Sequence, residues 1–502
     1  MFKNFKNWIS QNKLEFFLLV FIISFGGFLR LYQITGHATF LGDEGRDALV
    51  VKRMIVDHRF TLLGPTTSLG QMYLGPFYYY MMAIPMWLMG LDPAGPAVMV
   101  GLMGTLTIFM VWLLGREFFS PVAGITASAL YAVSLLVINH TRSSWNPNPM
   151  PLFAALAIYG LFKSLKNKDG RWLVLVGASL GVAFQLHYIS LVLIGLVITI
   201  FIFCHFVYKI RFRSWTYLAG VVSFLLVISP QILFELRHNF ITAKALLRYL
   251  VNRGEGADAG LGLNGLMPVS LYGRLFVGLL TSSNRLIGYL LAAFTGLTAL
   301  VLLVREKGWK GKNLGLFILV AWVLLGSFGV PLYEGKIHDH YLGFLFPTPF
   351  LLFGFVFAKL WENKKLKYLL LAGVLGLIIF DFSKTNIPQK VGPNYQIKRV
   401  KLVSTTIAND VGNETFNLAL FSPTKDFQAL HYRYFLELAS KRPKDYGEYQ
   451  NIDNLYVIVE VDPRTPEELG LWEVGTFGSF KREKEWSFDF QVKLYKITKE
   501  TE

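Results

Sequence analysis

Cysteine and charge are both scarce in this sequence of 502 residues. Its single cysteine, Cys204, lies inside an apolar run, so neither an intrachain disulfide nor a zinc site built from cysteines is expected. Only 16% of the residues are charged, whereas 53% are hydrophobic, which departs from the usual composition of soluble domains. The composition therefore favours a chain that lies largely within a lipid bilayer.

Three kinds of motif are also missing. The net charge of +16 comes without a nucleic-acid-binding motif, and the basic residues do not gather on one soluble module, so no nucleic-acid partner is expected. There is no glycine-rich phosphate loop on the predicted cytoplasmic side. There is also no internal repeat, and many transporter folds are built from such repeats.

What the sequence contains instead is a series of apolar runs long enough to cross about 30 Å of hydrocarbon. The first run follows a basic N-terminus without a small-residue cleavage site, so it is expected to be retained as a helix. A shorter run, 76–90, contains Pro85 and is predicted to be a partly inserted helix that does not cross. Eleven runs are predicted to span the membrane: 14–33, 96–114, 120–138, 150–165, 172–186, 189–208, 215–235, 284–304, 314–331, 342–360 and 367–382.

The charge of the loops between these runs indicates their sides, because lysine and arginine accumulate in cytoplasmic loops. With eleven spans, the N-terminus and every second short loop are strongly basic, whereas the opposite short loops hold little more than Arg142 and Lys336. A crossing at 76–90 would scatter the basic loops over both sides. The sequence therefore predicts a multi-pass plasma-membrane protein with a cytoplasmic N-terminus and an extracytoplasmic C-terminus.

From residue 383 onward the chain reads as ordinary soluble sequence. Strand-like patterns occur at 454–461 and 488–497, and a helical pattern occurs at 427–440. The expected fold is an all-α polytopic membrane domain of about eleven transmembrane helices, residues 1–382, followed by a small extracytoplasmic α/β domain, residues 383–502. The outer loops expected in the membrane domain are 34–95, 139–149, 236–283 and 332–341.

The first outer loop carries a group of charges in the stretch DEGR, residues 43–46. Asp43 and Glu44 open a helical pattern with one apolar face, which is typical of a helix at the membrane surface. Such a pair can supply a general base, and Arg46 one turn later can bind a phosphate. The alternative is that Asp43 caps the helix and Glu44 interacts with its dipole. The two interpretations are compatible, because a capping carboxylate can still face a reaction centre.

Further polar and aromatic side chains lie at the outer ends of the predicted spans. The tyrosines of the first loop either belong to the aromatic belt or stack on a sugar ring or polyprenyl chain. The polar residues of the second loop either punctuate it between prolines or contribute to a site. The candidates for binding the donor phosphate or the substrate are Arg46, Tyr78, Tyr79, Arg142, Asn146, His187, Lys336, His340 and Tyr341.

A metal site is the least specific of these hypotheses. His338 and His340, with Asp339 between them, are candidate ligands for a divalent metal ion. Two histidines at this spacing in a loop are common by chance. Binding of a phosphate by Lys336 and His340 is therefore favoured over binding of a metal.

Three short motifs, taken in order, resemble the GT-C superfamily of integral-membrane glycosyltransferases, in particular the branch of the protein O-mannosyltransferases and the aminoarabinose transferase of lipid A. The motifs are DEGR at 43–46, GPFYYY at 75–80 and HYLGFLFPTP at 340–349. The similarity covers about residues 10–380. It implies that Asp43 is the catalytic carboxylate, that Glu44 supports it and that Arg46 lies near the lipid phosphate.

Two parts of the sequence depart from the pattern of that family. Gly75 stands where relatives often carry a lysine before the Pro-Tyr-Tyr stretch, so phosphate binding must rely on other cations. Asn146 and Asn148 stand where relatives often carry an aspartate. The C-terminal domain has no motif that can be transferred from the family.

The function implied by the resemblance is inverting transfer of a sugar from a polyprenyl-phosphate donor to a protein, glycolipid or envelope-glycan acceptor on the outer face of the membrane. A transporter or flippase of lipid-linked sugars is the alternative. Such a protein is expected to carry ionisable residues near the bilayer midplane, whereas Glu235 and Asp381 fall near the predicted ends of spans. A non-catalytic scaffold would leave the charges at 43–46 unexplained.

Overall fold

The structure is a computed structural model, and it describes residues 2–67, 72–251, 267–306, 313–333, 337–385, 387, 392 and 394–500. The chain divides into two compact units. We call residues 1–32, 61–81 and 98–392 the helical unit, and residues 33–60, 82–97 and 393–502 the sheet unit. Helices α5 (Phe77–Leu88) and α6 (Gly95–Phe118) contribute residues to both units.

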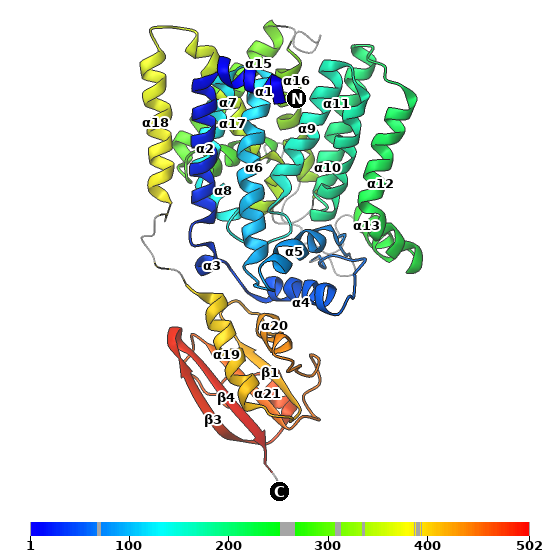
Figure 1. Ribbon diagram of the computed structural model, residues 1–502, viewed down its shortest axis with the longest axis vertical. Helices are drawn as coiled ribbons and strands as arrows, with labels where there is room; N and C mark the ends of the chain where they lie inside the picture. The colour runs from blue at the N-terminus through cyan, green and yellow to red at the C-terminus, as the bar shows by residue number, and fades with distance from the viewer. Residues whose placement is uncertain are drawn as a thin grey trace. The chain divides into compact units, whose positions relative to one another are not determined.

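Every run that the sequence predicts to span the membrane is helical in the structure (Figure 1). A helix satisfies its own backbone hydrogen bonds, which a long apolar segment requires in hydrocarbon. The other helices of the helical unit are α1 (Phe2–Gln11), α2 (Lys13–Leu31), α7 (Pro121–Val133), α8 (Leu135–His140), α9 (Met150–Asn167), α10 (Leu173–Leu186), α11 (Ser190–Val207), α12 (Ser214–Arg237), α13 (Ile241–Val251), α14 (Met267–Leu280), α15 (Arg285–Arg305), α16 (Leu314–Gly329), α17 (Pro347–Trp361) and α18 (Lys367–Lys384), with 3-10 turns η1 (Gly170–Trp172), η3 (Val330–Leu332) and η4 (Asp339–Leu345).

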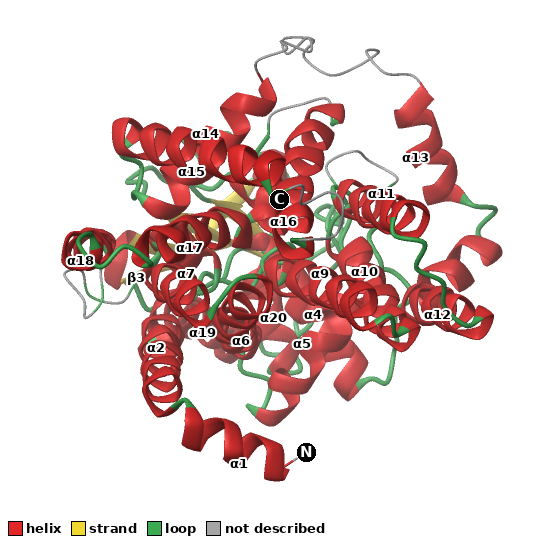
Figure 2. Ribbon diagram, turned by 90° about the horizontal axis from the view of Figure 1, so that it is seen from above, coloured by secondary structure: helices red, strands yellow, loops and turns green. Residues whose placement is uncertain are grey.

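The long helices of the helical unit run roughly parallel, so that many of them are seen nearly end-on in Figure 2. Helix α10 packs against α9 and α12, α17 packs against α7, and α14 packs against α15. Glycine permits some of the close approaches: a Cβ on Gly354 of α17 would lie 2.5 Å from the carbonyl oxygen of Ala123 in α7. Small residues at helix crossings are typical of membrane proteins.

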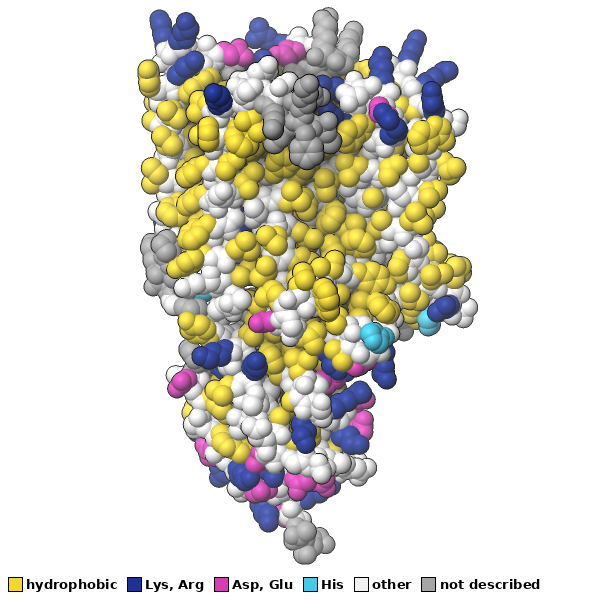
Figure 3. All heavy atoms as spheres, viewed as in Figure 1, with side chains coloured by type: hydrophobic (Ala, Val, Ile, Leu, Met, Phe, Trp, Pro, Cys, Tyr) yellow, Lys and Arg dark blue, Asp and Glu magenta, His cyan; other side chains and the backbone are white. Residues whose placement is uncertain are grey.

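Among the described residues, six helices are long and apolar enough to cross a membrane, and a seventh span results if η4 and α17, bent by 47°, count as one. Apolar side chains are frequent on the face of the helical unit that Figure 3 shows, and many large apolar residues of this unit are exposed. The structure therefore confirms a mostly helical, multi-pass membrane chain, whereas the number of eleven crossings stays a prediction. Helix α5 has 12 residues, about 18 Å of rise, which is less than the roughly 30 Å of a hydrocarbon core.

The sheet unit contains the small C-terminal sheet that the sequence predicts. The strand order is β1-β2-β4-β3, with β1 parallel to β2 and the other two pairs antiparallel. Its core includes Leu455, Val457 and Val459 of β2 with Tyr495 and Ile497 of β4. The elements of this part are α19 (Gln396–Asp410), β1 (Phe416–Phe421), α20 (Leu430–Leu438), β2 (Asn454–Glu460), α21 (Trp472–Phe477), β3 (Phe480–Phe488), η5 (Asp489–Gln491) and β4 (Val492–Lys499).

The sheet unit also includes part of the first predicted outer loop, with α3 (Ile34–His37) and α4 (Gly42–Val56). Helix α4 packs directly against α20. A Cβ added to Gly45 would collide with the backbone nitrogen of His431, so only glycine permits this approach. Just before α4, the backbone N–H of Phe40 donates to Oε1 of Gln396 at 3.0 Å. The helix that carries the acidic motif therefore packs against residues of the C-terminal part of the chain.

Candidate active site

Asp43, Arg46 and Asp47 form a bonded group at the start of α4. The Arg46 guanidinium donates from Nη1 to Oδ1 of Asp43 at 2.8 Å and from Nε to Oδ1 of Asp47 at 2.9 Å. The two carboxylates differ in burial, since 59% of the Asp43 side-chain surface is exposed and only 3% of the Asp47 surface is. The buried Asp47 therefore fixes the position of the Arg46 guanidinium, and the guanidinium in turn orients the exposed carboxylate of Asp43.

Glu44 has a different environment from its neighbour. Its Oε2 accepts a hydrogen bond from the backbone N–H of Leu41 at 3.1 Å, which satisfies one of the open donors at the start of α4. Burial raises the pKa of the Glu44 carboxyl to about 7, and the charges of Asp43 and Asp47 also raise it, although backbone hydrogen bonds act in the opposite direction. Adjacent carboxyls in unlike environments can differ in protonation near neutral pH.

The alternative in which Asp43 caps the helix is not supported. Leu41, with extended backbone angles, occupies the cap position, and α4 begins at Gly42. Asp43 is the second residue of the helix, and its side chain accepts a hydrogen bond from Arg46. The helix starts earlier than the sequence suggests because Glu44 reaches back to the backbone of Leu41.

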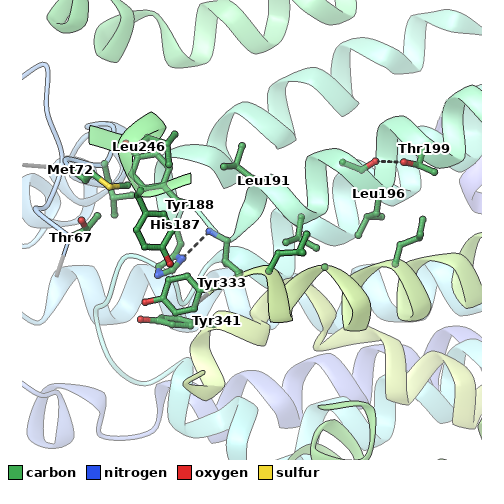
Figure 4. A pocket seen from close by; sticks show the side chains of 18 residues that line it. Thr67, Met72, His187, Tyr188, Leu191, Leu196, Thr199, Leu246, Tyr333 and Tyr341 are labelled. Carbon is green, nitrogen blue, oxygen red and sulfur yellow. Dashed lines mark hydrogen bonds between the residues drawn. The ribbon is translucent and has the colours of Figure 1, made fainter. Parts of the chain in front are cut away.

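The helical unit contains a cavity of about 380 Å³. Figure 4 shows its two parts: aromatic and polar side chains gather at one end, and apolar residues of α11 such as Leu191 and Leu196 extend away from them. His187 and Tyr341, both predicted site residues, lie at the polar end with their ring centroids 4.6 Å apart. Tyr333, which the sequence analysis did not include among the candidates, also lines the polar end, and its ring centroid lies 5.2 Å from that of Tyr341.

His187 is neutral at this site. Its Nδ1 accepts a hydrogen bond from the backbone N–H of Ile189 at 3.1 Å, which leaves the proton on Nε2. Burial lowers the pKa of His187 to about 4. The ring can donate one hydrogen bond to a ligand but supplies no positive charge near pH 7.

His340 joins this group and extends it. Its ring lies 4.5 Å from that of Tyr341 and 4.2 Å from that of Trp145. His338 and His340 stack on each other with their centroids 5.5 Å apart. In the part of the chain that the structure describes, no three residues of the kinds that bind metals come together. The rings of His338 and His340 pack with those of Tyr341 and Trp145. Lys336 lies outside the described residues.

The predicted residues of the second outer loop bond to the backbone of the helical unit. The guanidinium of Arg142 donates to the carbonyl oxygens of Leu29 and Tyr32, each at 2.9 Å. Asn146 donates from Nδ2 to the carbonyl oxygen of Leu186 at 2.6 Å. These bonds tie the loop to the ends of α2 and α10.

Tyr78 and Tyr79 are buried, so neither ring presents an open face in the helical unit. The Tyr78 hydroxyl lies 2.8 Å from Oγ of Ser144. Gly75, the position where relatives often carry lysine, packs against the side chain of Gln185, which a Cβ at this position would strike. Glycine at this position thus has a packing reason.

Arg274 of α14 is a cation that the sequence analysis missed. Its guanidinium donates to the carbonyl oxygen of Ile337 at 2.8 Å and is paired with Asp339. It therefore lies beside the histidine segment 338–340. The available signal was an arginine within an otherwise apolar stretch, SLYGRLF, of the third predicted loop.

A sequence family and several solved structures are similar to this chain. The dolichyl-phosphate-mannose-protein mannosyltransferase family matches residues 74–234. ArnT from Cupriavidus metallidurans, crystallised with undecaprenyl phosphate, is 13% identical with a TM-score of 0.60, over 95% of this chain and 97% of that chain. The archaeal oligosaccharyltransferase AglB from Archaeoglobus fulgidus, in complex with an inhibitory peptide and a dolichol-phosphate, is 14% identical with a TM-score of 0.51, over 90% of this chain and 70% of that chain. No curated protein sequence matches.

These similarities confirm the predicted resemblance to the GT-C superfamily, to which ArnT and AglB both belong. The chain has the fold of a GT-C membrane protein, with a helical membrane part and a small C-terminal sheet. The matching family and both of these structures are glycosyltransferases.

Proposed function

We propose that this chain transfers a sugar from a polyprenyl-phosphate donor to an acceptor on the outer face of the membrane. The observation that carries the proposal is the exposed Asp43 carboxylate, which Arg46 holds at 2.8 Å on a helix of a GT-C fold. A transferase of this kind needs a base that the acceptor can reach, and Asp43 is accessible where Asp47 is buried. Glu44 supports it by holding the start of α4.

The proposed reaction is a single displacement at the anomeric carbon. An acceptor oxygen forms the new bond to that carbon while the bond to the phosphate oxygen breaks and its electron pair leaves with the polyprenyl phosphate. Asp43 takes the acceptor proton in the same step. Arg46 keeps the carboxylate oriented. Displacement from the opposite side inverts the anomeric configuration.

The cavity in the helical unit is the proposed place for the donor lipid. Its apolar part suits an isoprenoid chain, because burying apolar surface drives binding. At its polar end, the Nε2–H of His187 and the hydroxyls of Tyr333 and Tyr341 can donate to phosphate oxygens. Arg274, near His340, is proposed to supply the positive charge that a lysine gives in relatives.

The proposed orientation places the N-terminus in the cytoplasm and the sheet unit outside. Most of the basic residues in the described parts of the alternate short loops are exposed, and such residues accumulate on the cytoplasmic side of membrane proteins. In Figure 3, Lys and Arg side chains gather at the upper edge of the helical unit, beyond the apolar surface. The exposed residues of these loops are Lys166, Lys168, Arg171, Lys209, Arg211, Arg213, Arg305, Lys359, Lys364 and Lys365.

The proposal is tested by mass spectrometry of envelope glycans from cells with and without the protein. We expect the loss of one sugar from one class of glycan, and its return when the wild-type chain is restored. A flippase would also remove that sugar in cells, so the purified protein is then given the lipid-linked donor and the acceptor. Transfer in this assay supports the enzyme, and its absence with an active control enzyme contradicts it.

A further inference from the structure

The sheet unit holds a cavity of its own, of about 200 Å³, between α4, α20 and the segment 442–446. Four arginines and two carboxylates contribute to its lining, so the charged groups of a largely apolar wall are positive on balance. It is smaller than the roughly 300–1,000 Å³ of pockets that hold drug-sized molecules. It therefore suits one ring or one charged group of a larger ligand. The charged lining residues are Arg46, Arg53, Arg433, Glu437, Arg442 and Asp445.

Two of these arginines are fixed within the wall. Arg433 donates to the carbonyl oxygens of Gln428 at 2.9 Å and Lys444 at 2.6 Å. Arg53 is bonded to Glu437. These bonds hold the two guanidinium groups in place, so they contribute fixed positive charge to the wall of the cavity.

Arg442 is more open than the others. Its side chain is 59% exposed, and its contacts are long: 3.5 Å to Asp445 and 4.0 Å to Glu437. Long, exposed ion pairs contribute little stability. An anionic group on a ligand can therefore engage Arg442 at little cost to the fold.

An aromatic cluster continues from the cavity. Tyr446 lines the cavity, and its ring lies 5.3 Å from that of Phe427 and 6.1 Å from that of Trp472. These three rings are exposed, and Trp472 rests on the buried Tyr449 at 5.7 Å. Exposed aromatic faces carry negative partial charge and attract the positive C–H edges of a partner. One face of a pyranose ring presents such C–H groups.

We propose that this cavity and the aromatic cluster bind an anionic saccharide of the acceptor. The inference rests on the proposed function, because it names the acceptor class for the same site. Arg46 lines the cavity and is bonded to Asp43, so a saccharide held there lies beside the proposed base. The aromatic rings stack on the sugar rings, and Arg442 binds the carboxylate or phosphate.

The test measures binding and needs neither donor nor turnover, so its failure is distinct from failure of the proposed function. Saturation-transfer NMR is recorded on the full chain in lipid nanodiscs with tri-galacturonate, and with neutral maltotriose as the comparison. We expect tri-galacturonate to bind the wild-type chain at least about tenfold more tightly than maltotriose, since its charge-assisted bonds are the stronger ones. Arg442→Gln should weaken the acidic probe about tenfold or more, and Tyr446→Ala should weaken both probes.

The matched control is Arg482→Gln, which removes an exposed arginine of β3, 3.1 Å from Glu467, that does not line the cavity. It should leave the affinity for tri-galacturonate as in the wild type. Equal affinity for the two probes, equal loss in the control, or undiminished binding by Arg442→Gln would each overturn the proposal. Both cavity variants alter exposed side chains, so thermal unfolding of each is expected to match the wild type.

Discussion

At the scale of single residues, Arg46 connects the candidate site, because it forms ion pairs with an exposed and with a buried carboxylate. Asp47 is almost fully buried, and its pair with Arg46 at 2.8 Å fixes the guanidinium. A buried charge needs such a partner. The orientation of Asp43 therefore depends on Arg46, which is itself fixed by its ion pair with the buried Asp47.

Arg46→Gln should therefore lower kcat, raise KM for the lipid donor, or do both. A charge-assisted hydrogen bond is worth about 1.5–3 kcal/mol, so the expected fall in kcat/KM is at least about tenfold. Initial rates of sugar transfer in nanodiscs measure it. Arg59→Gln, an exposed arginine just after the same helix, serves as the control. Wild-type rates in a folded Arg46→Gln chain would remove this residue from the site.

The raised pKa of Glu44 predicts that the free energy of unfolding depends on pH. The carboxyl has an ordinary pKa of 4.5 in the unfolded chain, and burial raises its pKa to about 7 in the folded chain. Between these values the folded chain holds a proton that the unfolded chain has lost, so stability falls as pH rises from about 4.5 to 7. Glu44→Gln should remove this decline and unfold at a higher temperature than the wild type at pH 7. Parallel pH profiles of the two unfolding midpoints would contradict the assigned burial.

At the scale of elements, the contact between α4 and α20 connects the acidic motif to the C-terminal residues. Gly45 allows it, since the backbone of His431 occupies the space of a side chain. Lys52 and Arg53 on the same helix lie against Glu437 of α20, the lysine at 3.7 Å. The position of Asp43 is therefore set by residues nearly 400 positions further along the chain.

Gly45→Ala should destabilise the sheet unit by about 1–3 kcal/mol, because an added methyl group in a packed contact forces the backbone to shift. The matched control is Gly475→Ala in α21, where a Cβ would meet nothing within 4 Å. Alanine favours a helix over glycine by about 1 kcal/mol, so the control should be neutral or slightly stabilising. Thermal unfolding of both chains gives the comparison. Equal midpoints would show that α4 does not depend on this contact.

Long apolar runs made the membrane helices predictable, because their length and backbone bonding are imposed by the bilayer. Other elements carried weaker signals. Strand β1 is buried almost throughout and lacks alternation, and β3 is an edge strand of mostly charged residues. Helix α14 has only 14 residues, too few to be recognised as a span.

The candidate site was predictable in part. The motif at 43–46 follows from sequence order, but the burial of Asp47 and the bond that Arg46 makes to it depend on packing. The proximity of His187 to Tyr341 joins segments about 150 residues apart and follows from the arrangement of helices. Arg274 was missed because its partner, Asp339, is distant in sequence.

At the scale of the whole molecule, the proposed orientation is the property on which the site assignment depends. It is tested with single cysteines in a Cys204→Ser background, since the native cysteine is buried. Ser164 is buried as well, so the cytoplasmic position is Asn167→Cys and the outer position is Asn413→Cys, both exposed. In intact cells, an impermeant thiol reagent should label position 413 and leave position 167 unlabelled until the membrane is opened. Labelling of both positions from the same side of the membrane would contradict the predicted topology.

The central claim is that Asp43 takes the acceptor proton during sugar transfer, and Asp43→Asn tests it most directly. Asparagine keeps the shape of the side chain and can still accept a hydrogen bond from Arg46, but it cannot serve as the base. The measurement is the turnover number for polyprenyl phosphate release in the presence of acceptor, with donor binding measured in the same preparation. We expect turnover to fall about a hundredfold or more while donor binding persists, as for the loss of a general base. Transfer within about tenfold of the wild-type rate, a difference of roughly 1.4 kcal/mol, would contradict the claim.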